Sequence, residues 1–89
     1  MKAERVTLCN RLGLHARAAS KLVSTAAEFE SIVNVLRDDR RVNAKSIMGV
    51  LMLAAPVGTE LEIQCDGPDE DDALQALVAL VDDRFGEGE

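Results

Sequence analysis

The sequence is poor in the side chains that bind nucleic-acid bases and metal ions. It contains two Phe and neither Trp nor Tyr, so it lacks the aromatic platforms on which proteins stack single-stranded bases. Its formal net charge of −6 also disfavours contact with a phosphate backbone. One histidine and two cysteines are too few for an all-protein zinc site or a disulfide framework. We therefore predict no nucleic-acid partner, no metal and no cofactor.

Long hydrophobic runs and a targeting leader are missing as well. The longest apolar run, residues 50–57, is far shorter than the roughly 20 residues of a membrane-spanning helix, and no charged-then-apolar leader begins the sequence. These absences predict a cytoplasmic protein that does not insert into membranes. With 89 residues, the chain is expected to form a single domain, residues 1–89, and to be a monomer.

Charge is distributed unevenly along the chain. Residues 1–45 hold nine Lys or Arg and five Asp or Glu, whereas residues 46–89 hold one basic and eleven acidic residues. If the two halves fold together, a relatively positive region remains on an acidic protein. Such a region is either an ordinary solvated surface or a docking face for an acidic partner or an anionic group. Its candidate members are Arg11, Arg17, Lys21 and Lys45.

Hydrophobic periodicity predicts strands at residues 4–9, 31–37, 40–43 and 60–66. Helices are predicted at 16–27, at 47–53, and from Asp69 onwards, where Asp69 and Asp72 resemble an N-cap with an acidic first turn. So few elements cannot bury both faces of a sheet. We therefore predict an α+β fold of two layers, a four-stranded antiparallel sheet with three helices on one face. The strand residues expected to face the helices are Val6, Leu8, Val33, Val35, Leu61, Ile63 and Cys65.

The segment Gly13-Leu14-His15-Ala16-Arg17 lies where a loop enters the first helix. A helix N-terminus exposes unpaired backbone N–H groups and the positive end of the helix dipole, which together attract anions. Neutral imidazole is a competent nucleophile near neutral pH, and the guanidinium of Arg17 suits phosphate oxygens. The pattern therefore fits a transient phosphohistidine at His15. Taken alone, a histidine before a helix is also compatible with a simple cap or a surface residue.

Two segments resemble a known family at once. Residues 13–23, Gly-Leu-His-Ala-Arg-Ala-Ala-Ser-Lys-Leu-Val, closely resemble the active-site signature of the HPr family of phosphotransferase-system carriers. Residues 45–53, Lys-Ser-Ile-Met-Gly-Val-Leu-Met-Leu, resemble the regulatory-serine segment of that family. The likeness also extends to length and element order, and so covers essentially the whole chain.

This resemblance implies an open-faced β-sandwich of βαββαβα order and a definite chemistry. His15 would be phosphorylated at Nδ1 by enzyme I, with phosphoenolpyruvate as the ultimate donor. Arg17 would contact the phosphoryl group, and the backbone N–H groups of Ala16 and Arg17 would help to hold it. The group would then pass to an enzyme II A component or a nitrogen-branch equivalent. Such a chain is a phosphoryl-transfer intermediate and not a free-standing enzyme.

One position departs from the family pattern. The family usually has Pro where this chain has Ala18. Alanine gives up the pre-set φ of proline in a first helical turn, and it restores one backbone donor near the anion site. We expect the chemistry to survive. Ala18, together with the tail segment 84–87, is more like the nitrogen-related carriers, although the sequence leaves the sugar and nitrogen branches both open.

The second segment carries a regulatory and a docking prediction. Ser46 is expected to cap a short helix, and by resemblance it is also the residue that an HPr kinase/phosphorylase would phosphorylate. Val50 and Leu53 are expected to point into the core. The other apolar residues of this helix either join the core or form an exposed docking patch for enzyme I and the acceptors. These docking candidates are Ile47, Met48, Leu51 and Met52.

Two rival interpretations remain at this stage. The first is a regulatory relative that signals only through Ser46; such relatives lack the active-site histidine, which is present here as His15. The second is a small ligand-binding or interaction domain with a ferredoxin-like layer of similar size. It would give no reason for the two motifs to occur together.

Overall fold

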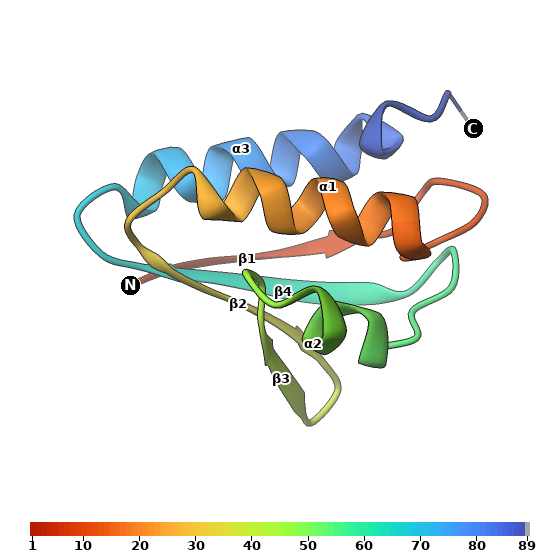
Figure 1. Cartoon of the computed structure of the whole chain (residues 1–89), viewed down its shortest axis with the longest axis horizontal. Coiled ribbons are helices and arrows are strands. Elements are labelled where there is room, and N and C mark those ends of the chain that lie inside the picture. Colours follow the sequence, from red (N-terminus) through yellow and green to blue (C-terminus); the bar gives the residue numbers. More distant parts are fainter. Residues whose placement is uncertain (89) are drawn as a thin grey trace.

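Four strands and three helices form the two predicted layers. The computed structural model describes residues 1–88. Figure 1 shows α1 and α3 side by side across one face of the sheet, and the short α2 packs on α1 and β3. The α+β fold and its βαββαβα order are confirmed. The elements are β1 (Lys2–Thr7), α1 (Ala16–Ala27), β2 (Ile32–Arg37), β3 (Arg40–Asn43), α2 (Ile47–Met52), β4 (Glu60–Asp66) and α3 (Glu70–Asp82), followed by a 3-10 turn, η1 (Arg84–Gly86).

The sheet has the strand order β1-β4-β2-β3, and every neighbouring pair is antiparallel. β1 spans residues 2–7 and not 4–9, because its pairing with β4 ends where Thr7 faces Glu60. Beyond that pair, Leu8 still exchanges backbone hydrogen bonds with the loop before β4: its N–H donates to Thr59 O over 2.9 Å, and its carbonyl accepts from Gly58 over 2.7 Å. These bonds bring the loop after β1 alongside residues 55–59.

The core lies between the sheet and the helices. The predicted inward-facing strand residues are all buried, and none is more than 6% exposed. Alternation of side chains along each strand therefore placed the sheet's inner face correctly. The helices contribute mostly small and branched side chains, which let them lie close to the sheet. These buried helix residues are Ala18, Ala19, Leu22, Ala26, Val50, Ala73, Leu77 and Val81.

α3 starts where predicted and has the predicted acidic first turn, but its N-cap residue, Asp69, does not cap the helix with its side chain. Its carboxylate accepts instead from the backbone N–H groups of Glu30 and Ser31 and from the Ser31 hydroxyl. These hydrogen bonds, the one from the hydroxyl first, lower the pKa of Asp69. The carboxylate thus pins the turn between α1 and β2 to the start of α3. A local cap motif could not reveal donors that lie 38 and 39 residues away in sequence.

Gly13 is the position at which the loop after β1 requires glycine. Its φ is +65°, and a Cβ atom there would come within 2.5 Å of the Ala55 carbonyl and 2.8 Å of Pro56. Next to it, the Leu14 N–H donates to Ala55 O over 2.8 Å. The backbone at Gly13 therefore rests directly on the loop before β4. This contact fixes the point at which the chain turns into α1.

We predict that Gly13→Ala destabilises the protein by about 1–3 kcal/mol more than Gly58→Ala does. Gly58 is the matched control, since its φ is also positive, at +88°, but a Cβ there would meet nothing within 4 Å. Both variants carry the backbone strain of a left-handed alanine, and only the first adds a clash with the neighbouring loop. Urea unfolding of both variants measures the difference. Equal destabilisation would show that the loop contact at Gly13 is not tight.

Candidate active site

His15 is the N-cap of α1. Its backbone is extended, with φ −78° and ψ −179°, and its Nδ1 accepts a hydrogen bond from the Arg17 N–H over 3.3 Å. The ring thus satisfies one of the unpaired donors that begin every helix. The imidazole is half-buried, with 28% of its side chain exposed. The predicted placement of His15 at a helix entry is confirmed, and its Nδ1 faces the positive end of the helix dipole.

An open hollow of about 440 Å³ lies beside the imidazole. Ala16 and Arg17, the first two residues of α1, are both exposed, so the backbone and side chains expected to hold a phosphoryl group do lie together. The hollow has basic side chains and an apolar one at its rim. It is lined by Arg11, Leu12, His15, Ala16, Arg17 and Glu87.

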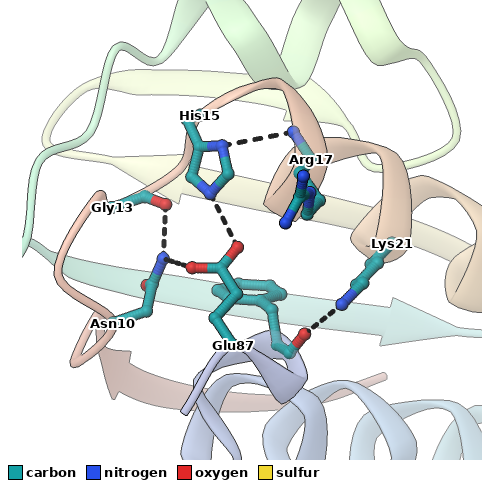
Figure 2. A network of polar contacts seen from close by, with 7 residues as sticks. Asn10, Gly13, His15, Arg17, Lys21 and Glu87 are labelled. Atoms are coloured by element: carbon teal, nitrogen blue, oxygen red, sulfur yellow. Dashed lines mark hydrogen bonds and ion pairs between the residues drawn. The ribbon is translucent and has the colours of Figure 1, made fainter. Parts of the chain in front are cut away.

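The sequence analysis missed two residues that contact this site. Figure 2 shows the carboxylate of Glu87 reaching the other ring nitrogen of His15, with Oε2 at 2.6 Å from Nε2. Asn10 links the loop before α1 to the C-terminal tail. Its Nδ2 donates to the Gly13 carbonyl over 2.7 Å and to Glu87 Oε1 over 3.0 Å. Asn10 is completely buried. Both nitrogens of the imidazole therefore have a protein partner.

The tail after α3 carries Glu87 to the site. Phe85 is fully buried in the core and anchors the tail, with a φ of +54°. The ammonium group of Lys21, on α1, donates to the Phe85 carbonyl over 2.6 Å. A lone Phe after an acidic helix was the sequence signal that this tail returns to the core. It could not show that Glu87 would then face a histidine 72 residues earlier.

Opposing effects act on the pKa of Glu87. Partial burial raises it, whereas hydrogen bonds, from Asn10 first and then from His15, lower it. The net result is a lowered pKa. Glu87 is therefore ionised at neutral pH, and a carboxylate faces the Nε2 edge of the ring.

Ser46 caps α2, as predicted: its hydroxyl oxygen accepts from the Gly49 N–H over 3.2 Å. Two arginines from the β2–β3 hairpin hold the other end of this six-residue helix. Arg37 donates to the carbonyls of Leu53 and Ala54 over 2.7 and 3.0 Å, and Arg40 donates to Met52 O over 3.0 Å. Carbonyls at a helix C-terminus have no partner within the helix. Contacts from outside thus fix both ends of α2.

The predicted docking residues on α2 divide into two groups. Val50 and Leu53 point into the core, as expected. Leu51 is half-buried and packs against that core, so it is the predicted docking residue that the structure does not expose. The other three docking candidates are exposed, Ile47 by 39% of its surface and Met48 and Met52 by 66% each. This contradicts the alternative that all four belong to the core. We call these three exposed residues the α2 patch.

The four basic residues of the predicted positive region have different surroundings. Arg11 and Arg17 are exposed and line the hollow beside His15. Lys21 binds the tail, and Lys45 donates to the Phe29 carbonyl over 2.7 Å. The two lysines therefore take part in hydrogen bonds that hold the fold together. Positive charge at the hollow comes mainly from the two arginines.

None of the helices in residues 1–88 has the length and apolar character needed to cross a membrane. Within the same residues, no group of three or more His, Cys, Asp or Glu side chains could hold a metal ion.

Comparison with known proteins gives concordant results. Residues 2–83 match the family described as "PTS HPr component phosphorylation site". The phosphocarrier protein HPr of Cupriavidus necator is 55% identical over 83 residues, which are 93% of each chain. The phosphocarrier protein NPr of Shewanella violacea is 45% identical over 87 residues, or 97% of this chain and 96% of that protein. The crystal structure of HPr-C-His from Thermoanaerobacter tengcongensis superposes with a TM-score of 0.95, at 42% identity and 98% coverage of both chains.

The family match spans both predicted motifs and nearly all of the chain. It therefore decides against the small ligand-binding domain as an alternative. The two-layer fold, the helix capped by a histidine and the sequence relatives all point to the same family. The chain belongs to the HPr family, the phosphocarriers of the phosphotransferase system.

Proposed function

We propose that His15 is the residue that carries the phosphoryl group. It accepts the group at Nδ1 from enzyme I, with phosphoenolpyruvate as the ultimate donor, and gives it to an enzyme II A component or a nitrogen-branch equivalent. One observation carries this proposal: Nδ1 lies at the N-terminus of α1 and accepts from the Arg17 N–H, so its lone pair points at the helix donors. His15 is also the single histidine of the chain.

The geometry supports a simple transfer step. The Nδ1 lone pair attacks phosphorus, the bond from phosphorus to the donor breaks, and that bond's electron pair stays with the donor. Once Nδ1 is bonded to phosphorus, it no longer accepts from the Arg17 N–H, which can then turn to a phosphoryl oxygen. The Ala16 N–H and the Arg17 guanidinium add donors at the same helix end. Transfer onward is the reverse of this step with a new acceptor.

This role makes the chain an intermediate in phosphoryl transfer and not an enzyme with a substrate of its own. Carriers named HPr and NPr both match it, so the sugar and nitrogen branches remain alternatives. Ala18, where the family usually has Pro, is completely buried in the first turn of α1. The cytoplasmic location, the monomeric state and the single domain of residues 1–89 remain predictions.

The α2 patch is the surface on which we place the protein partners. It exposes three large apolar side chains on one short helix, and α2 packs against α1, whose N-cap is His15. Exposed apolar side chains gathered on one element mark interaction sites, and flexible methionines can adapt to several partners. Enzyme I and the acceptor would then use the same face in turn.

Ser46 is the proposed regulatory position. It caps α2, and a phosphate at a helix N-terminus is tolerated by the dipole. Phosphorylation by an HPr kinase/phosphorylase would therefore leave the fold intact and add negative charge at the edge of the α2 patch. The charge would act on docking, and His15 would keep its chemistry.

We expect His15→Asn to abolish acceptance of labelled phosphate from enzyme I and phosphoenolpyruvate, with the fold unchanged. Asparagine is the fitting substitute because it caps helices well but has no imidazole nucleophile. The wild-type phosphate should be acid-labile and base-stable, as a phosphohistidine is. Labelling of the variant at wild-type stoichiometry would show that another residue accepts the group.

Met48→Glu should weaken binding to enzyme I at least about tenfold, because it places a charge in an apolar contact. Ile32→Glu is the matched control: Ile32 is 64% exposed but lies on β2, among the side chains that face away from the helices. Titration calorimetry measures both affinities. If the two variants bind equally well, docking does not use the α2 patch.

Ser46→Asp should bind enzyme I several-fold more weakly than Ser46→Asn does. Both residues cap helices as serine does, so the pair isolates the added charge, and the acidic variant should be as thermally stable or slightly more so. Melting curves and binding titrations together give the comparison. Equal affinity for the two variants would argue against electrostatic control at this position.

A further inference from the structure

The two nitrogens of His15 face opposite kinds of group. Nδ1 accepts from a backbone N–H, so its lone pair must be free of a proton. Nε2 lies 2.6 Å from a carboxylate oxygen of Glu87, and an ionised carboxylate can only accept, so Nε2 must carry the ring proton. The surroundings therefore fix one tautomer of the neutral imidazole, with the unprotonated nitrogen, Nδ1, at the N-terminus of α1. Figure 2 shows both contacts.

We propose that Glu87 is a positioning residue that holds the Nε2 proton of His15 throughout the phosphoryl cycle. This inference rests on the proposed function of His15. It assigns to the tail a part in transfer that is separate from the docking of partners.

The change in charge of the imidazole during phosphoryl transfer explains why a carboxylate beside Nε2 is useful. When Nδ1 bonds to phosphorus and Nε2 keeps its proton, the ring becomes a cation. Glu87 then faces that cation directly and compensates its charge. When the group leaves, the electron pair of the Nδ1–phosphorus bond stays on Nδ1, and the neutral Nε2–H imidazole is restored. No proton has to enter or leave the ring in either direction.

Other contacts in the fold hold both residues of the His15–Glu87 pair in place. Only 12% of the Glu87 side chain is exposed, against 28% for His15, so water screens the pair only partly. The buried Asn10 amide holds the second carboxylate oxygen and, through Gly13, the loop that leads to His15. Phe85 and Lys21 anchor the tail itself. A carboxylate held at two oxygens keeps its direction toward the ring.

The test compares Glu87→Gln with Asp83→Asn. Each variant removes one negative charge from the same end of the chain, but Asp83 is exposed, and the carboxylate that contacts Nε2 of His15 is that of Glu87. Phosphorylation by enzyme I under single-turnover conditions should be about tenfold slower in Glu87→Gln, since a charge-assisted hydrogen bond is lost, and should reach the same stoichiometry. Asp83→Asn should match wild type.

Nitrogen-15 NMR of the phosphorylated proteins gives a readout that a purely structural role would not move. At pH 8, Nε2 should stay protonated to a greater extent in wild type and Asp83→Asn than in Glu87→Gln. Equal rates and equal Nε2 protonation in the two variants would overturn the role of Glu87 while leaving His15 as the carrier. Absence of labelling in wild type would instead overturn the proposed function.

Discussion

One hydrogen bond, from the Arg17 N–H to Nδ1 of His15, connects the fold to its chemistry. It starts α1, because it satisfies a donor that the helix cannot pair internally. It also orients the imidazole, so that Nδ1 lies where the helix dipole favours an anion. The rest of the molecule can be viewed as support for this geometry: the sheet places the loop, Gly13 lets the loop turn closely over Ala55, and the tail closes the other side of the ring.

Prediction from sequence succeeded where the signal was local. Alternation along the strands identified the inner face of the sheet, and helical spacing with Ser46 located α2 and its cap. His15 could be placed at a helix entry because a glycine loop and a good helix former flank it. Leu51 shows the limit of this reasoning, since periodicity on a six-residue helix does not decide which of its sides meets the core.

What the sequence could not show depends on contacts between distant segments. Asp69 has the residue type and spacing of a cap, yet donors from the α1–β2 turn take its carboxylate. Glu87 lies in a short acidic tail with no motif, and it becomes part of the site because Phe85 and Lys21 bring that tail back. Nothing in the sequence around Asn10 indicates its role. Only in the folded protein is it buried, where it joins the loop before α1 to the tail. Local sequence patterns carry no information about such pairings between distant segments.

The pairing of β1 with β4 also has a consequence for folding. Residues 2–7 pair with residues 60–65, so the first 65 residues must be synthesised and arranged before this ladder can form. The loop before His15 depends on that ladder, and the tail that reaches the ring comes later still in sequence. We therefore expect the ability to accept phosphate to arise only in the last stage of folding. A partly folded chain would present its helices without a competent histidine, and labelling would report native molecules alone.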